Sequence, residues 1–462
     1  MAIHPIEFRY GSSEMKRVWS EESRLQKMLM VEVALARAES ELGMIPESAA
    51  REIEEGARGV RLERVKEIED EIHHDMMALV MALSEKCGEA GKWVHYGATS
   101  NDILDTATAL QFKETITILR RELQRLQDEL LKRALEHKAT VCAGRTHGQI
   151  GVPTTYGLRF AIWASEIERH ITRLEELTPR ITVGKMSGAV GTQASFGRDG
   201  IKVEELTMKH LKIRPAEVSN QVIQRDRHSE FIFWAANLAT TLEKIGIEIR
   251  TLQRSEIGEV EESFTKDQIG SSTMPHKRNP IKSEQVCGLA RIIRGMVEPE
   301  LLNNTLWDER DLTNSSSERI IFPETCILID HILRTATKVL ENLKFHHKKI
   351  EENLELLKGL NMSEAVMIEL AKKGVGRQKA HKLVREAAKI AREEGLHLRE
   401  ALLRDPTIQK EMTREEIEYA TNPHNYIGTA IQKVERLGER LQKPHPDRED
   451  RTTPKSHRIN SL

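Results

Sequence analysis

The sequence predicts an all-α protein with a central bundle of long helices. Aromatic residues make up only 4% of its 462 residues, and almost no stretch alternates apolar and polar residues as a β-strand does. Apolar residues instead recur at steps of three and four over three long segments, 107–140, 231–252 and 326–343. This spacing places them on one face of a helix, and that face needs partner helices to bury it. Three such segments separated by loops predict a bundle.

Glycine and proline interrupt this helical pattern at 148–153, 179–200 and 270–280. A simple coiled-coil rod is the alternative to a bundle, and it has no need of such breaks. The interruptions therefore favour a globular bundle over a rod.

We expect three folded domains and a tail. An N-terminal helical domain of short helices, broken at Pro46, covers 1–105, and a central long-helix domain covers 106–358. A C-terminal domain of shorter helices covers 359–441. Residues 442–462 hold three prolines, many charges and little to bury, so they are expected to be disordered.

Composition excludes several classes of protein. The net charge of -2 provides no basic field for binding nucleic acid. The densest apolar stretch, MMALVMAL at 76–83, is too short to span a bilayer, and residues 1–20 show no signal peptide. The four cysteines form no CxxC pair, which argues against a zinc site or a disulfide framework. We expect a soluble cytoplasmic protein with no nucleic-acid or membrane partner.

Polar segments recur between the apolar helices. They are HHDMM at 73–77 with HYGATSND at 95–102, GRTHGQ at 144–149, SNQVIQRDRH at 219–228, GSSTMPHKRNP at 270–280 and WDERDLTNSSSER at 307–319. Each has a structural explanation by itself. Residues 99–102, for example, are typical of a helix N-cap, and His73 with His74 could lie on a solvated face. Their recurrence favours one shared site.

The chemistry of these segments is that of anion binding and proton transfer. The histidines lack the spacing of a zinc site, and GxxxxGK[ST], GxGxxG and GxSxG are all absent. The polar segments are instead rich in Arg, Lys, Ser, Thr, Asn and His, which suits the binding of a polyanionic small molecule and proton transfer. We expect neither a metal nor a cofactor.

GSSTMPHKRNP closely resembles the signature loop of the fumarase/aspartase superfamily, whose members eliminate fumarate from succinyl compounds. HYGATSND and GRTHGQ resemble its other two signature regions, in the expected order, and the resemblance extends to about residue 441. The HKRNP ending is similar to the succinyl-nucleotide lyases or the bacterial carboxymuconate cycloisomerases. Arg9-Tyr10, SNQVIQRDRH and WDERDLTNSSSERI favour the nucleotide lyases. A cycloisomerase and a non-catalytic helical scaffold are the alternatives.

The resemblance implies the catalytic roles. Ser271 corresponds to the general base, which can act only as a stabilised alkoxide, and His147 corresponds to the general acid. Lys277 and Asn279 are expected to clamp the carboxylate at which negative charge develops. Gly270 would let this loop move as a lid.

The remaining residues of the expected site bind or orient the substrate. His74 and His95 are expected to orient or charge the acid, Thr99 and Ser100 to bind a carboxylate, and Gln221 to bind substrate. The candidate nucleotide contacts are Arg9, Tyr10, Arg310, Ser315 and Arg319, and His73 and Asp75 complete the substrate-binding set. His73 stands where an arginine or similar residue is expected before the His-Asp pair, and Asn314 stands where bacterial relatives usually have histidine. The resemblance also implies a homotetramer whose active sites are shared between subunits.

Overall fold

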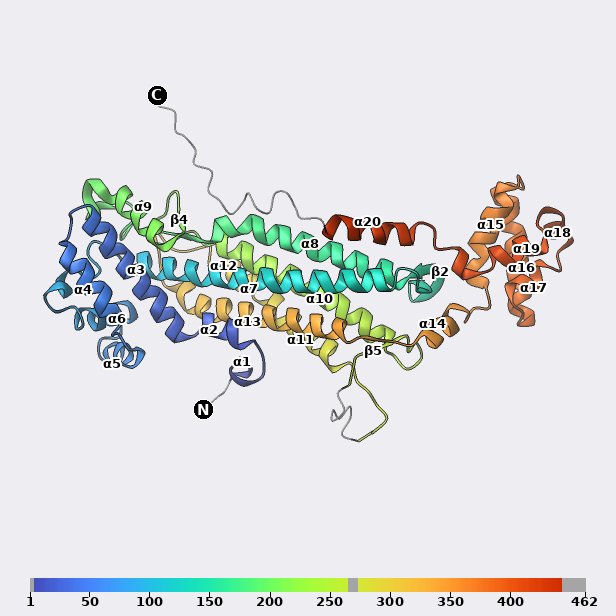
Figure 1. Cartoon of the computed structure of the whole chain (residues 1–462), viewed down its shortest axis with the longest axis horizontal. Coiled ribbons are helices and arrows are strands. Elements are labelled where there is room, and N and C mark those ends of the chain that lie inside the picture. Colours follow the sequence, from blue (N-terminus) through green and yellow to red (C-terminus); the bar gives the residue numbers. More distant parts are fainter. Residues whose placement is uncertain (1–3, 265–272, 443–462) are drawn as a thin grey trace, which may run out of the picture. The chain divides into compact units, whose positions relative to one another are not determined.

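The computed structural model describes residues 4–264 and 273–442, which are mainly α-helical (Figure 1). The all-α fold is therefore confirmed. The chain forms two compact units. Unit 1 comprises Met1–Arg125, Ile167–Ile247 and Ile281–Lys338, and unit 2 comprises Leu126–Glu166, Glu248–Pro280 and Val339–Leu462. The predicted domain boundaries at 105/106 and 358/359 stay a prediction, and residues 443–462 of the predicted tail lie outside the described residues.

Four long helices contribute residues to both units. They are α7 (Ser100–Glu136), α8 (Tyr156–Ile181), α10 (Asp226–Leu252) and α13 (Thr313–Glu341). Unit 1 also contains α1 (Pro5–Phe8), α2 (Ser13–Val18), α3 (Glu21–Glu41), α4 (Glu47–Ala57), α5 (Leu62–Ile72), α6 (Asp75–Ser84), α9 (Gly200–Leu211), α11 (Ile281–Gly295) and α12 (Val297–Leu302). Unit 2 also contains α14 (His347–Leu354), α15 (Ser363–Lys372), α16 (Arg377–Glu394), α17 (Leu398–Leu402), α18 (Pro406–Glu411), α19 (Arg414–Ala420) and α20 (Ala430–Gln442).

Short 3₁₀ helices and strands complete the described structure. The 3₁₀ helices are η1 (Gly88–Trp93), η2 (Ala194–Asp199), η3 (Leu360–Met362) and η4 (Pro423–Asn425). The strands pair as β1 (Val141–Thr146) with β2 (Gln149–Thr155), β3 (Val183–Gly184) with β4 (Arg214–Pro215), and β5 (Val260–Glu261) with β6 (Lys344–Phe345). The β1–β2 hairpin is the main element that the sequence pattern did not predict.

The three predicted apolar stripes fall on α7, α10 and α13. In unit 1 these helices meet at an aromatic cluster. The ring of Phe112 on α7 lies 5.0 Å from Phe231 on α10 and 5.2 Å from Phe322 on α13, both edge-on. Such pairs each contribute roughly 0.5–1.5 kcal/mol beyond the burial of their surface. Trp234 on α10 connects this cluster to α8, because its indole N–H donates a hydrogen bond of 3.0 Å to the carbonyl of His170.

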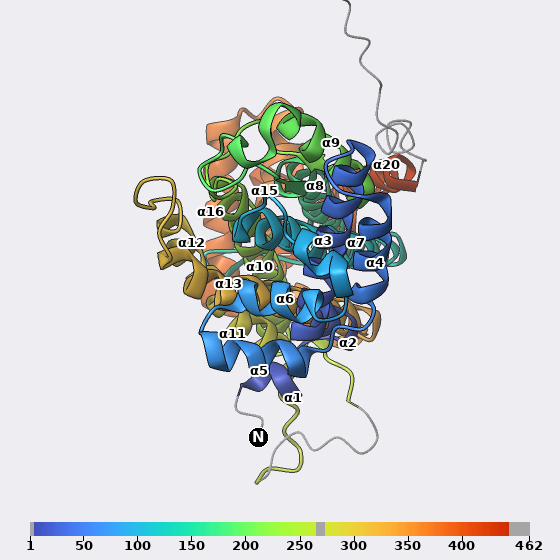
Figure 2. The same ribbon diagram turned by 90° about the vertical axis from the view of Figure 1, so that its left-hand side faces the viewer.

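The N-terminal helices of unit 1 enclose a separate apolar core. Leu29, Leu35, Ile53, Leu79 and Leu83 are buried members of it. Figures 1 and 2 show α9 beside α3, with α4 also packed on α3. At 21 residues, α3 is longer than the short helices expected here. This core supports the segments that carry His74 and His95.

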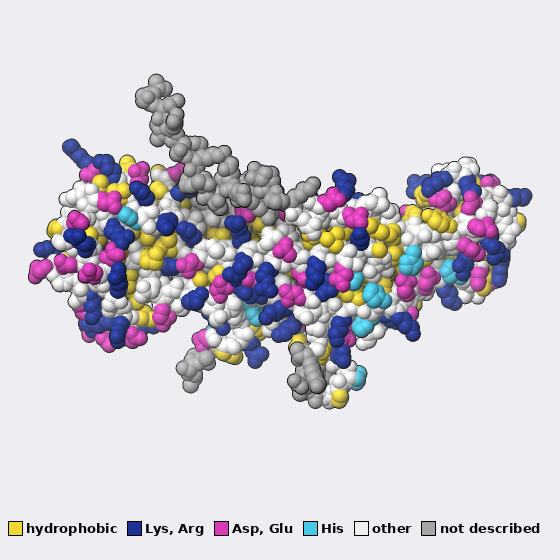
Figure 3. Space-filling view, viewed as in Figure 1, with side chains coloured by type: hydrophobic (Ala, Val, Ile, Leu, Met, Phe, Trp, Pro, Cys, Tyr) yellow, Lys and Arg dark blue, Asp and Glu magenta, His cyan; other side chains and the backbone are white. Residues whose placement is uncertain are grey.

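The C-terminal helices of unit 2, α15 to α19, bury a core of their own around Leu370, Val384, Leu398, Ile408 and Ile417. No helix in the described part of the chain is long and apolar enough to cross a membrane. On the face drawn in Figure 3, Lys and Arg side chains are interspersed with Asp and Glu. This mixture agrees with the near-zero net charge of the chain.

Candidate active site

A cavity of about 140 Å³ in unit 1 is lined by α3, α7, α13 and the segments that precede α10 and α13. Three of the predicted nucleotide contacts line it, namely Arg310, Ser315 and Arg319. Arg24 and Arg225 also line it, which brings four guanidinium groups to one small cavity. Three carboxylates, those of Glu21, Asp105 and Glu318, line the cavity as well. The arginines exceed them by one, and this excess positive charge favours an anionic ligand.

A buried ion-pair network forms one wall of this cavity. The guanidinium of Arg225 donates to both oxygens of Asp105, at 2.9 and 3.0 Å, and to Glu318 at 2.7 Å. Burial alone would raise the pKa of Asp105, but the positive charge of Arg225 lowers it below the usual value. Asn314 also donates to Glu318, at 3.0 Å. The guanidinium of Arg225 is thus already paired with carboxylates of the protein.

Three polar atoms of the lining residues are buried without a hydrogen-bond partner. They are Nε of Arg310 and the side-chain oxygens of Asn101 and Asn314. Buried polar groups are normally paired, so each of these atoms has capacity for a polar ligand or water. One donor and two acceptors suit a ligand that carries hydroxyl or amine groups as well as negative charge.

Asp75 connects the first polar segment to this cavity. Its Oδ2 accepts from Arg319 at 2.6 Å and lies 3.5 Å from Arg24. Burial opposes ionisation of Asp75, but the Arg319 charge and the amide of Met76 keep the pKa of its carboxyl below the usual value. The structure thus brings Asp75, Arg310, Ser315 and Arg319 together, as one site would require.

His73 and His74 shape the turn that precedes Asp75. His73 ends α5 with a left-handed backbone, φ 55°, and its side chain is exposed. His74 caps α6, because its Nδ1 accepts the amide hydrogen of Met77 at 3.2 Å. Both side chains lie at the protein surface near Asp75, and the cap holds His74 in one orientation.

The second predicted segment places hydroxyl groups at the start of α7. That helix begins at Ser100, and the amide of the preceding Thr99 donates to Asp102 at 2.8 Å. Asp102 is itself buried and is paired with Lys185 at 2.5 Å. A helix N-terminus with two adjacent hydroxyls can bind a carboxylate. His95 lies on the same loop and is bonded through Nδ1 to Glu32 at 2.7 Å.

Gln221 also lies near the cavity, since its Oε1 accepts from Arg310 at 3.4 Å. Its amide nitrogen donates to the carbonyl of Ala189 at 2.9 Å. Arg9 and Tyr10 are placed differently. Arg9 is exposed at the end of α1, and Tyr10 packs on His331 with ring centroids 5.3 Å apart. Neither lines the cavity.

In unit 2, His147 stands at the tip of the β1–β2 hairpin. The pair Thr146–Gln149 closes a two-residue loop in which His147 and Gly148 have φ of 53° and 72°. Positive φ at both positions is the type I′ geometry that matches the twist of the strands. The His147 side chain is exposed, which leaves its imidazole accessible to a ligand.

A buried carboxylate is hydrogen-bonded to this hairpin and to the residue that follows it. Glu259 is 0% exposed and accepts hydrogen bonds from Arg145 at 2.5 Å, from Asn353 at 2.9 Å and from the hydroxyl of Tyr156. Arg145 is two residues from His147 on β1. Glu259 therefore fixes the strand that presents the predicted acid.

The signature loop is only partly described. Ser271, the predicted base, and Gly270 lie outside the described residues. Lys277 is exposed, and its amide donates to the carbonyl of Met274 at 3.0 Å, whereas Asn279 is half-buried. Arg278 anchors this end of the loop through an ion pair of 2.6 Å with Glu261.

Two further features are not candidate active sites. Among the described residues, His228, Glu300 and Glu318 form a group that metals could use, with ligand atoms within 4.8 Å of one another. Glu318 already binds Arg225 through both oxygens, and the guanidinium beside it disfavours a cation. Burial raises the pKa of Glu300 to about 8 and lowers that of His228 to about 3. Glu300 is thus largely protonated at neutral pH, and with Glu318 already paired to Arg225 the donor set fits a metal poorly.

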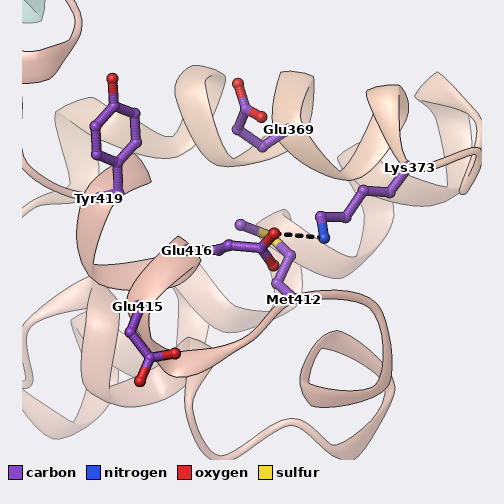
Figure 4. Close-up of a pocket in the computed structure, with 6 residues that line it drawn as sticks. All are labelled: Glu369, Lys373, Met412, Glu415, Glu416 and Tyr419. Carbon is purple, nitrogen blue, oxygen red and sulfur yellow. Dashed lines mark hydrogen bonds and ion pairs between the residues drawn. The ribbon is translucent and has the colours of Figure 1, made fainter.

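A cavity of about 210 Å³ in unit 2 contains none of the predicted residues (Figure 4). Its lining consists of Glu369, Lys373, Met412, Glu415, Glu416 and Tyr419. Lys373 and Glu416 pair at 2.7 Å across it, as Figure 4 shows, so part of its charge is already balanced.

Several polar residues that support the site were not predicted from the sequence, chiefly Glu32, Arg24, Asn101 and Glu259. Arg24 and Asn101 resemble ordinary polar residues on helices. A signal existed for Glu32, because it interrupts a run of buried residues spaced by three and four along α3. Charged residues inside an apolar stripe are rare and mark places that need a partner.

Comparison with known proteins agrees with these observations. Residues 7–295 match the family described as Lyase, and residues 359–437 match the family described as Adenylosuccinate lyase C-terminus. The chain is 54% identical to the adenylosuccinate lyase of Methanocaldococcus jannaschii over 96% of both chains. It is 55% identical to that of Pyrococcus abyssi over 95% of this chain and 97% of the relative.

Solved structures show the same fold. A fumarate lyase from Mesorhizobium sp. BNC1 has a TM-score of 0.86 and 32% identity, covering 93% of this chain and 98% of its own. The 3-carboxy-cis,cis-muconate lactonizing enzyme from Pseudomonas putida has a TM-score of 0.87 and 33% identity, covering 95% and 98%.

Proposed function

The chain belongs to the adenylosuccinate lyase family, and we propose that it cleaves adenylosuccinate to AMP and fumarate in purine nucleotide biosynthesis. The same site would release fumarate from the related succinyl-carboxamide ribotide. Near-full-length identity to curated adenylosuccinate lyases carries this proposal. The cavity lined by arginines in unit 1 supports it independently, because the substrate is a polyanion.

The chemistry is a β-elimination. A base removes the proton next to one carboxylate, the resulting carbanion is stabilised as a dianion, and an acid protonates the departing nitrogen. We assign the base to Ser271, the acid to His147 and the stabilisation of the dianion to Lys277 and Asn279. Donors aimed at the developing charge should contribute most to catalysis. The exposed position of His147 at the tip of the β1–β2 hairpin supports its role, since an acid must reach its substrate.

The nucleotide end of the substrate would occupy the cavity of unit 1. Arg310, Ser315 and Arg319 would bind the phosphate and ribose, with Asp75 holding the Arg319 guanidinium in place. The unpaired oxygens of Asn101 and Asn314 could accept hydrogen bonds from hydroxyl or amino groups. Thr99 and Ser100 would bind a carboxylate at the start of α7.

The assembly we propose is a cytoplasmic homotetramer with active sites shared between subunits and with no metal in the reaction. His74, His95 and the nucleotide-binding residues belong to unit 1, whereas His147 and Lys277 belong to unit 2. Sharing between chains would allow unit 2 of one subunit to complete the site that begins on unit 1 of another.

Purified protein should convert adenylosuccinate to AMP and fumarate without added metal. The reaction can be monitored by absorbance, and the products identified by chromatography. Exhaustive chelation should leave the rate unchanged. Turnover of carboxymuconate with none of succinyl nucleotides would favour the cycloisomerase function instead. Inactivity toward every succinyl compound would favour a scaffold.

A further inference from the structure

A buried carboxylate lies beside the predicted active-site residue His95. Glu32 is on the inner face of α3 and is only 2% exposed. Its Oε1 lies 2.7 Å from Nδ1 of His95. The His95 side chain keeps 14% of its surface exposed, so the ring is held at Nδ1 and remains partly accessible.

We propose that Glu32 is a positioning residue that holds His95 as an imidazolium beside the start of α7, where it faces an anionic group of the substrate. This inference rests on the proposed function and assigns a charge state to one residue of that site. Glu32 accepts the Nδ1 proton, which fixes the ring and leaves Nε2 to donate toward a ligand. A neutral imidazole bonded in the same way would have a lone pair at Nε2, which repels an anion.

The loop geometry supports a fixed position for the ring. His95 has a left-handed backbone, φ 61°, and its carbonyl accepts from the amide of Ala98 at 3.3 Å. That conformation costs a residue other than glycine about 1 kcal/mol, so surrounding contacts must hold it. The same loop leads within five residues to Thr99 and Ser100. An imidazolium, two hydroxyls and a helix N-terminus therefore belong to one short segment.

The charges around His95 favour its protonated form. Glu32 faces it from α3 and Asp102 from α7, while Lys185 offsets part of the Asp102 charge at 2.5 Å. Burial lowers the pKa of His95, but the charge and hydrogen bond of Glu32 outweigh this and raise the pKa above its usual value. Below that raised pKa the imidazolium is present, and it is lost as the pH rises through it.

Glu39 offers a matched control on the same face of α3. It lies seven residues after Glu32, is 0% exposed, and neither of its carboxylate oxygens has a hydrogen-bond partner. Burial and the charge of Glu32 raise the pKa of Glu39 to about 9, so it is neutral at pH 7. Glu32 thus carries the charge that acts on His95, and Glu39→Gln removes a carboxyl that contributes none.

Exchange of the histidine C2 proton, followed by mass spectrometry across pH, tests the pairing without requiring activity. The His95 midpoint should fall by about one pH unit or more in Glu32→Gln, because the buried negative charge is gone. It should be unchanged in Glu39→Gln. Equal midpoints in the wild type and Glu32→Gln would overturn the proposal.

Kinetics tests the consequence for the substrate. In Glu32→Gln the fall of kcat/KM for adenylosuccinate at alkaline pH should begin at lower pH, mainly because KM rises. In Glu32→Asp, which keeps a carboxylate, the fall should return part of the way toward its wild-type pH. The kcat/KM of the double variant Glu32→Gln/His95→Gln should be no lower than that of His95→Gln alone. If the losses in kcat/KM of the two single variants added up in the double variant, or if Glu32→Gln left the pH profile unchanged, Glu32 would not act through His95. A wild type that cleaves no adenylosuccinate would defeat the proposed function, and the exchange midpoints would still decide the pairing.

Discussion

Asp75 shows how a single side chain serves both the fold and the candidate site. Its Oδ1 accepts the amide hydrogen of Met76 at 2.7 Å at the start of α6, and its Oδ2 accepts from Arg319 at 2.6 Å. Its position in a polar segment made it predictable. Arg24, which lies 3.5 Å from the same carboxylate, was not predictable, because an arginine on an amphipathic helix usually belongs to a solvated face.

Glu39 predicts a pH dependence of stability. Its pKa of about 9 in the folded protein lies far above that of an exposed glutamate, so the folded state binds the proton more tightly. Stability contributed by this residue is therefore present at low pH and falls as the pH rises from about 5 toward 9, by on the order of 1 kcal/mol per pH unit at most.

Glu39→Gln should remove that fall, because an amide cannot ionise. The thermal unfolding midpoint of the variant should exceed that of the wild type by an amount that grows between pH 5 and pH 8. The substitution breaks no hydrogen bond, because neither carboxylate oxygen of Glu39 has a partner. A change in stability can therefore be assigned to ionisation. A difference that is constant with pH would show that Glu39 does not titrate as described.

The long helices could be predicted from sequence, and the hairpin could not. Phe160, Ala164, Ile167, Ile171 and Leu174 give α8 the same stripe that identified α7, α10 and α13, so even the helix left unpredicted carried a signal. The hairpin segment contains three glycines and a proline, which are depleted in strands. Glu259, which is distant in sequence, binds Arg145 and Tyr156, and no local pattern reveals these contacts.

The hairpin turn gives a prediction at the scale of an element. Gly148 has φ 72° and nothing within 4 Å of the position of an added Cβ, so Gly148→Ala would strain only the backbone. We expect a loss of about 1 kcal/mol in stability and a larger loss of kcat, because the turn presents His147.

Gly374→Ala is the matched control. Gly374 also has positive φ, 88°, and open space around it, but it lies in the turn that follows α15. Steady-state kinetics and thermal unfolding of both variants separate the two effects. Equal changes in kcat would mean that the His147 turn has no special role.

At the scale of the whole molecule, the recurrence of polar segments predicted one shared site but not which chains contribute to it. The polar segments lie in both units. In unit 1, Arg310, Ser315 and Arg319 line the cavity, and Asp75 binds Arg319 beside it. Spacing along the chain cannot tell whether His147 of unit 2 serves the same chain or a neighbour. Assembly depends on surfaces that become buried only when chains meet, and one sequence carries no direct record of them.

Subunit complementation tests the central claim most directly, namely that this lyase draws each active site from several chains. His147→Gln and Ser271→Ala proteins, each inactive toward adenylosuccinate, are mixed, dissociated and allowed to reassociate. Because some sites in a mixed tetramer would then receive both native residues, we predict that part of the wild-type rate returns. Mixed tetramers, verified by native mass spectrometry, that remain inactive would contradict the shared site.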